Sequence, residues 1–158
     1  DCICRVQKKH IGEGCDHSIN NCLVFNKKEN AFKHLDTIKT LTKDSFINKL
    51  RDASLEGLVP STSNKQDGIT YICNCCTCCC YPIRGSFALD LVHTWPEHAY
   101  RVILNDDDCI SCGVCIDRCQ FDVFKEVDGD IKADTKKCWG CGICTNSCPV
   151  EALSLDKK

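Results

Sequence analysis

The chain has 158 residues, enough for one or two small domains, and its formal net charge of −2 points neither toward nor away from nucleic acid. Its 18 cysteines exclude an ordinary globular composition and indicate either a disulfide framework or metal ligation. The sequence has no apolar run long enough for a membrane span and no signal peptide, so we expect a cytoplasmic protein that binds metal through its thiols.

The first segment, residues 1–26, combines cysteines with chain-breaking glycines. Gly12 and Gly14 interrupt it, so we expect a loop that wraps around ligands rather than a regular element. His10 and His17 lie among the thiols, but the thiols suffice as ligands, and we interpret both histidines as surface or hydrogen-bonding residues. The cysteines of this segment are Cys2, Cys4, Cys15 and Cys22.

Two stretches without cysteine follow, and both have helical character. Residues 28–35 are weakly periodic, whereas residues 42–58 carry a clear pattern that Thr42 can cap and Gly57 can end. The pattern predicts a helix that covers an apolar side of a metal-binding module. Its apolar face consists of Phe46, Ile47, Leu50 and Ala53.

A dense run of thiols comes next, after a polar connection (60–68) and a predicted strand (69–72). Neighbouring thiolates in such a run would repel one another unless cations neutralise them. Adjacent cysteines direct their side chains differently, so Cys75 and Cys76 can serve different metal centres. Free thiols and a metallothionein-like zinc site remain alternatives. The run consists of Cys73, Cys75, Cys76, Cys78, Cys79 and Cys80.

Residues 84–100 are predicted to link this module to a second one. One or two helical turns over 87–92 would stop at Trp95-Pro96. Beyond the linker, we expect strands at 101–104 and 153–155 and a hairpin of 123–127 with 130–133 around Asp128-Gly129, a pair typical of tight turns.

The second module contains the strongest signal, a repeated C-x2-C-x2-C-x3-C run at 109–119 and 138–148. This spacing is typical of paired [4Fe–4S] clusters, in which the fourth cysteine of each run ligates the other cluster. A disulfide scaffold or zinc site is the alternative. The predicted ligands are Cys109, Cys112, Cys115 and Cys148 for one cluster and Cys138, Cys141, Cys144 and Cys119 for the other.

Ten cysteines remain outside this repeat, all of them before residue 81. The first segment has too irregular a spacing for a cluster of its own, and the dense run has too many thiols for one. We therefore expect the two to share at least one additional iron–sulfur cluster, and we favour two. The candidate ligands are Cys2, Cys4, Cys15, Cys22, Cys73, Cys75, Cys76, Cys79 and Cys80.

Residues 101–155 resemble a bacterial-type two-cluster ferredoxin domain, with all eight ligand positions matched. In this family a proline usually follows the fourth cysteine of each run. The second run has this proline, Pro149, whereas the first run has Gln120, a difference that concerns backbone geometry and not ligation. Nearly the whole chain is also similar to a group of multi-cluster iron–sulfur proteins of anaerobes. The shared motifs are Cys-x-Cys-Arg at 2–5, Gly-x-Gly-Cys at 12–15, Asn-Cys-Leu-Val-Phe at 21–25, Gly-Leu-Val at 57–59 and Ile-Cys-Asn-Cys-Cys at 72–76. In many members a winged-helix-like region precedes the opening motif, and it is absent from this sequence.

These observations predict an α+β protein with three parts. A loop-rich, cofactor-organised iron–sulfur module with a covering helix (1–83) is followed by a linker (84–100) and a ferredoxin-like domain (101–158). No phosphate loop or nucleophile–base pair is recognisable, so we expect a non-catalytic chain that transfers electrons as a subunit or partner of an anaerobic oxidoreductase complex.

Two other functions stay open. A cluster-based redox or oxygen sensor is one, although the chain lacks the basic stripe that direct contact with nucleic acid would need. An enzyme that uses an unusual cluster near residues 73–80 is the other. For electron transfer, we expect carboxylates of the ferredoxin part to dock on a basic patch of a redox partner. These are Asp106, Asp107, Asp108, Asp117, Asp122, Glu126, Asp128, Asp130 and Asp134.

Overall fold

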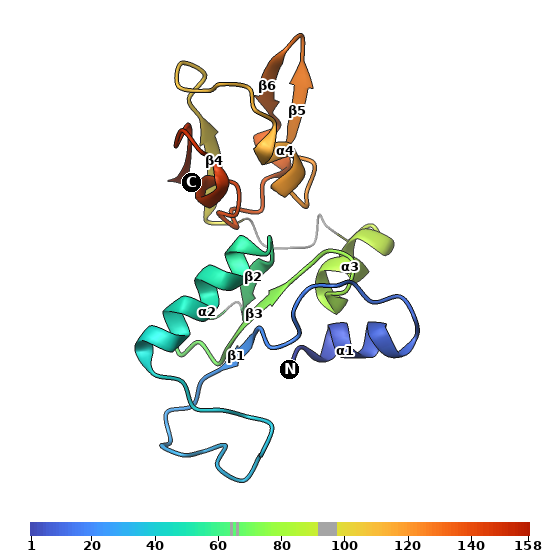
Figure 1. Ribbon diagram of the computed structural model, residues 1–158, viewed down its shortest axis with the longest axis vertical. Coiled ribbons are helices and arrows are strands. Elements are labelled where there is room, and N and C mark those ends of the chain that lie inside the picture. Colours follow the sequence, from blue (N-terminus) through green and yellow to red (C-terminus); the bar gives the residue numbers. More distant parts are fainter. Residues whose placement is uncertain (64, 66, 92–97) are drawn as a thin grey trace. The chain divides into compact units, whose positions relative to one another are not determined.

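The computed structural model describes residues 1–63, 65, 67–91 and 98–158 (Figure 1). The chain forms two compact units, Asp1–Leu89 and Asp90–Lys158. Both contain short helices and short strands joined by irregular segments, in agreement with the predicted α+β, loop-rich class. The expected stop at Trp95-Pro96 lies outside the described residues. Within the described ranges, no helix combines the length and apolar character needed to cross a membrane.

The first unit is built on a three-stranded antiparallel sheet of β1 (Cys22–Val24), β2 (Val59–Thr62) and β3 (Tyr71–Cys75), in the order β1-β3-β2. Cys22 lies opposite Cys73, and Val59 lies opposite Cys75. The strand predicted at 69–72 therefore begins two residues later and runs into the cysteine run. The predicted polar connection likewise begins as β2. Both shifts arise because β3 is the central strand, and its cysteine-bearing backbone pairs on both sides.

Helix α2 (Lys43–Leu55) confirms the helix predicted over 42–58, with an end three residues earlier. The Thr42 hydroxyl accepts a hydrogen bond from the Ser45 backbone N–H (3.2 Å), which caps the helix. Gly57 adopts a φ of 80°, and the following amide bonds back to the Ala53 carbonyl (2.9 Å), which ends it. The helix packs on β2 and β3 through its fully buried Ala53 (Figure 1).

The expectation that residues 1–26 form a loop is wrong, because α1 (Ile3–His10) and β1 both lie in this segment. The buried residues on the inward face of α1 are Cys2, which precedes the helix, and Arg5 and Lys8 within it. Two of these are basic, so the sequence shows no apolar stripe that would reveal a helix.

Residues 28–35 form successive turns instead of the expected helix. Asn30 has a φ of 54°, which lies in the left-handed region and breaks any helical run. Helix α3 (Tyr81–Ala88) follows directly on Cys80, earlier than the turns expected over 87–92. Pro82 is compatible with its first turn, where a missing N–H costs nothing.

The second unit contains two antiparallel pairs, β4 (Tyr100–Leu104) with β7 (Leu153–Lys157) and β5 (Phe124–Val127) with β6 (Asp130–Ala133). All four predicted strands are confirmed. Asp128 and Gly129 both have positive φ (55° and 87°), as a tight hairpin turn requires. Short helices carry the cysteine loops, namely α4 (Val114–Arg118), η2 (Thr135–Lys137) and η3 (Thr145–Ser147). Val102, Phe121, Val123, Phe124, Ile131, Ile143, Ala152 and Leu153 form the buried core.

Candidate metal centres

All 18 cysteines lie within the described residues, and all are free thiols. The disulfide framework that the composition also allowed is therefore not formed. Instead, the thiols gather in groups, two in each unit, and each group joins cysteines that are distant in sequence.

The first group of the second unit, the Cys109 site, surrounds a single cavity. Its four cysteines are Cys109, Cys112, Cys115 and Cys148. The remaining wall is mostly apolar and includes Leu104, Ile131 and Leu153. Gly113 begins α4 with a φ of 75°, which lets the loop turn around the cavity before Cys115. Four thiols in a mostly apolar wall fit an iron–sulfur cubane, and the set equals the one that crossed ligation predicts.

The second group, the Cys138 site, contains Cys119, Cys138, Cys141 and Cys144. Burial, together with the charges of Cys141, Cys119 and Cys138, raises the pKa of Cys144 to about 12. Such thiols resist ionisation unless a cation is present. The backbone N–H groups of Val102 and Gly140 donate to the Cys138 sulfur at 3.3 and 3.4 Å. Hydrogen bonds of this kind help to set the potential of a cluster.

Three stacked rings lie next to ligand cysteines in the sequence of the second unit or contact one that does. Trp139, the residue after Cys138, stacks on Phe121 with ring centroids 4.6 Å apart and planes at 9°. His98 stacks on the same indole at 4.9 Å and 28°. Sequence analysis did not single out these rings, although the position of Trp139 between two ligand cysteines was a usable signal.

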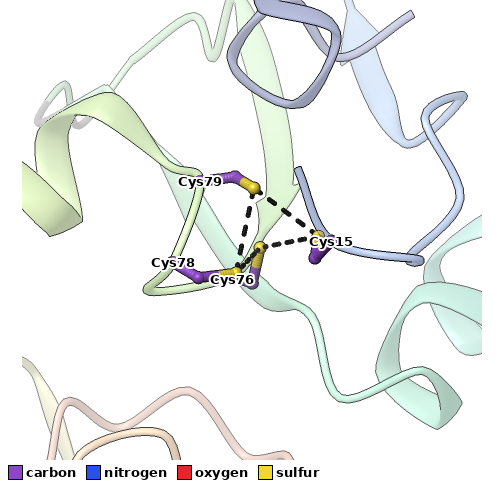
Figure 2. A group of neighbouring side chains, drawn as sticks. All are labelled: Cys15, Cys76, Cys78 and Cys79. Atoms are coloured by element: carbon purple, nitrogen blue, oxygen red, sulfur yellow. Dashed lines mark hydrogen bonds between the residues drawn. The ribbon is translucent and has the colours of Figure 1, made fainter. Parts of the chain in front are cut away.

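The first group of the first unit, the Cys15 site, consists of Cys15, Cys76, Cys78 and Cys79 (Figure 2). Their sulfur atoms all lie within 4.8 Å of one another. The Cys15 sulfur is 3.7 Å from that of Cys76 and 3.5 Å from that of Cys79, and the sulfurs of Cys76 and Cys78 are 3.1 Å apart. The arrangement matches a four-thiolate metal centre.

Local backbone structure explains how this site assembles. Cys76 follows the last residue of β3, and the turn that carries Cys78 and Cys79 is closed by a hydrogen bond from the Cys80 N–H to the Cys76 carbonyl (2.9 Å). Gly14 lets the chain fold back closely against the end of α1 just before Cys15, because a Cβ at Gly14 would come within 2.4 Å of Lys9 Cγ and 2.9 Å of Lys9 Cα. Cys15 then reaches the turn.

Cys78 was absent from the predicted ligands, yet it completes the Cys15 site. It is the one exposed member of the group. Its place within the dense run was the available signal, but the run offered six thiols and no rule for choosing among them. Burial raises the pKa values of Cys78 and Cys79 above their usual range, as expected where thiols crowd together without a cation.

The second group of the first unit, the Cys2 group, contains the other six thiols: Cys2, Cys4, Cys22, Cys73, Cys75 and Cys80. The sulfur atoms of Cys2 and Cys75 are 3.8 Å apart. The Cys22 thiol interacts with those of Cys2 and Cys73, and the Cys80 thiol interacts with that of Cys75. Cys4 lies at the margin, within the electrostatic reach of Cys2, Cys80 and Cys73.

The expected meeting of the two cysteine-rich segments is thus confirmed, since both groups combine thiols from residues 2–22 with thiols from residues 73–80. The adjacent cysteines are divided between the groups. Cys75 and Cys80 interact with the Cys2 group, whereas Cys76 and Cys79 belong to the Cys15 site, and the two groups touch because the thiols of Cys75 and Cys76 also interact with each other. His17 lies outside both groups, and its Nδ1 is 3.6 Å from a carboxylate oxygen of Glu56, an ion-pair contact too long for a hydrogen bond.

Comparison with known proteins bears on the second unit. A family described as 4Fe-4S binding domain matches residues 102–125 and again residues 131–154. A ferredoxin of Pyrobaculum islandicum is 34% identical over 55 residues, which are 34% of this chain and 51% of the relative. The chain thus spans about half the length of this curated relative. Residues 102–154 form a C-terminal two-cluster ferredoxin domain.

Proposed function

We propose that this protein transfers electrons through several iron–sulfur clusters. One observation carries the proposal. Each of the two matches to the 4Fe-4S binding family contributes three thiols to one site and a fourth thiol to the other. A [4Fe–4S] cluster with four thiolate ligands exchanges one electron with little rearrangement, which suits it to electron transfer. The Cys109 and Cys138 sites would each hold one such cluster.

The first unit would extend the path with further clusters. Thiolates are soft ligands, which favour iron–sulfur clusters, zinc or copper(I) over hard cations. The Cys15 site offers four thiols, and the Cys2 group offers more than four. We favour one cluster in each, which gives the chain four. The residues around them bind and orient the clusters and exclude water.

A redox partner, within an anaerobic oxidoreductase complex, would dock on the ferredoxin domain. All nine carboxylates of residues 106–134 named above are exposed. Three of them, Asp106 to Asp108, immediately precede the Cys109 site, where Cys112 is exposed and Ile110 is 61% exposed. An apolar contact ringed by acidic residues suits a partner with a complementary basic patch.

Iron and sulfide analysis of the anaerobically purified chain tests the cluster proposal. Iron and sulfide for three or four cubanes would support it. Iron for two cubanes would confine electron transfer to the ferredoxin domain, and zinc in the first unit would make that unit structural. The Cys15→Ala variant serves as the control, since it should remove the contribution of the Cys15 site alone.

Salt dependence tests the docking proposal. Steering between exposed charges weakens as ions screen it, over a Debye length of about 10 Å at 0.1 M. Electron-transfer rates with a basic partner should fall from low to high salt. Rates that stay constant would instead indicate a permanent, mostly apolar interface.

A second function is favoured by one feature of the Cys15 site. Cys78 is exposed, and Cys15 borders an open hollow that it shares with Asp16, His17, Ser18 and Glu56. A cluster held there could exchange its exposed thiolate for a substrate atom, as catalytic metal sites with an open position do. A change in the EPR spectrum of the first unit on addition of cyanide would support this function, and an unchanged spectrum would favour electron transfer alone.

A further inference from the structure

Arg5 is a charged residue in an unusual environment. It lies in the first turn of α1 and is 0% exposed, so its guanidinium has no access to bulk water. Burying an isolated charge costs many kcal/mol unless opposite charge compensates for it. The residue therefore needs a counter-charge within the first unit.

The two hydrogen bonds that Arg5 donates to backbone carbonyls do not supply one. Its Nη1 donates to the Ser18 carbonyl, and its Nη2 donates to the Asn74 carbonyl at 2.7 Å. Both acceptors are neutral. Within the part of the chain that the structure describes, the Nε–H is buried and meets no hydrogen-bond acceptor. A guanidinium has five N–H donors in a fixed plane, and this one keeps its buried Nε–H donor unpaired.

The charged groups facing Arg5 are thiols. Burial acts to lower the pKa of Arg5, but the charges of Cys75 and Cys2, and the hydrogen bond and charge of Cys76, outweigh it and raise that pKa above its usual value. Cys2 and Cys75 belong to the Cys2 group, whereas Cys76 belongs to the Cys15 site. Arg5 thus interacts with members of both thiol groups.

Glu56 is the other acidic residue within electrostatic reach of Arg5. Its side chain is 33% exposed, and its oxygens accept hydrogen bonds from the Ser18 backbone N–H (3.0 Å) and the Ser18 hydroxyl (2.5 Å). Solvent screens a carboxylate at that exposure, whereas the buried thiolates interact with Arg5 at a low effective dielectric constant. The cysteines of the two groups, which carry negative charge once they bind metal, can therefore supply the counter-charge that Arg5 needs.

We propose that Arg5 is the shared counter-charge of the Cys15 site and the Cys2 group, and that it raises the reduction potentials of the clusters bound there. The inference rests on the proposed function, because it requires clusters in the first unit. Reduction adds a negative charge to a buried site, and a fixed positive charge nearby stabilises the reduced form. The buried Nε–H has no acceptor of its own, and a hydrogen bond from it to the sulfur of a bound cluster would act in the same direction.

The test is a redox titration of the full-length, cluster-loaded chain, followed by EPR under anaerobic conditions. Arg5→Gln removes the charge and keeps a hydrogen-bonding side chain, whereas Arg5→Lys keeps the charge and loses the planar fork. Lys8→Gln is the matched control. It removes a positive charge from the same buried face of α1, but that charge is already paired with Glu13.

We expect Arg5→Gln to lower the equilibrium constant for one-electron reduction of the first-unit clusters at least tenfold, which corresponds to about 59 mV. The two ferredoxin clusters serve as an internal reference and should keep their potentials. Arg5→Lys and Lys8→Gln should each change the first-unit potentials much less. Unchanged potentials in Arg5→Gln would overturn the proposal.

Loss of iron separates the remaining cases. Wild-type protein with iron for only two clusters would overturn the proposed function of the first unit, and the inference with it. If Arg5→Gln alone loses first-unit iron while Arg5→Lys retains it, the need for a positive charge is supported. If both variants lose the iron of the first unit, Arg5 stabilises the fold through its two hydrogen bonds to backbone carbonyls. The proposal that Arg5 acts as a counter-charge is then wrong.

Discussion

The two units hold comparable numbers of thiols in very different surroundings. Among the described residues of the second unit, eight buried apolar side chains are joined by one buried cysteine, Cys144. Among those of the first unit, only Leu23, Ala53, Leu58, Val59 and Ile83 are buried beside five buried cysteines. The cysteines are thus half of the first unit's apolar interior.

This difference shows two ways to organise a thiol-rich fold. In the second unit, a hydrophobic core and two regular loops present the thiols, so the sites are formed by elements with their own packing. In the first unit, the thiols themselves occupy the place of the core. Metal binding then contributes directly to the folding free energy, because little apolar burial is available to replace it.

Removal of iron should therefore have the largest effect, and it should separate the two units. With a chelator under anaerobic conditions, we expect the first unit to lose its fold cooperatively, with amide protection in β3 lost completely. The hairpin β5–β6, which packs Phe124 and Ile131 in the apolar core, should keep part of its protection. Hydrogen exchange of the full chain measures both regions at once. Protected β3 amides in the iron-free chain would show that the first unit does not need metal for its fold.

A single cysteine substitution in the second unit should cost one cluster and no more. Cys119→Ala should abolish the EPR signal of the cluster at Cys138, Cys141 and Cys144 while the Cys109 site keeps its own. Cys148→Ala is the matched variant, with the opposite result. If Cys119→Ala disturbs the Cys109 site instead, the crossed assignment is wrong.

In the first unit, the effect of a cysteine substitution should depend on the number of thiols available. Cys15→Ala removes one of the four thiols of its site, so we expect loss of one cluster's iron. Cys4→Ala leaves five thiols in the Cys2 group, and we expect its iron content to stay near that of the wild type. Iron and sulfide analysis of both variants measures the difference. Equal losses would show that Cys4 is an obligatory ligand.

We expect the smallest effect from a change in α2, which should stabilise the first unit independently of metal binding. Thr42→Ala removes the hydrogen bond to the Ser45 N–H and should lower the free energy of unfolding of that unit by about 1 kcal/mol. This corresponds to a fall in Tm of about 4–8 °C for a unit of this size. Thr40→Ala, which alters an exposed threonine outside the helix, is the control. Equal Tm values for the two variants would exclude a capping role.

The second unit was predictable from sequence because its information is local. Three of the four thiols of each site lie within a seven-residue run, and the repeat of the run identifies the fourth. The hairpin was equally local, since Asp128-Gly129 carries the turn geometry itself. No distant contact was needed to predict either feature.

The first unit was predictable in composition but not in arrangement. Cys15 and Cys76 are 61 residues apart in the sequence. Their contact depends on the pairing register of β1 with β3 and on the close approach of Gly14 to Lys9. Helix α1 was missed because its inward face carries Arg5 and Lys8. A buried basic residue that compensates thiolates cannot be distinguished in sequence from a surface one.

Cys75 and Cys76 are consecutive residues, joined by a trans peptide bond, and their thiols belong to different groups. The planar peptide holds their Cα atoms about 3.8 Å apart whatever the rest of the chain does. Clusters bound in the two groups would therefore be bridged by a covalent path whose length no loop movement or solvent exchange can alter. The number of covalent bonds along that path would be set by the backbone and would not change when the surrounding sheet moves.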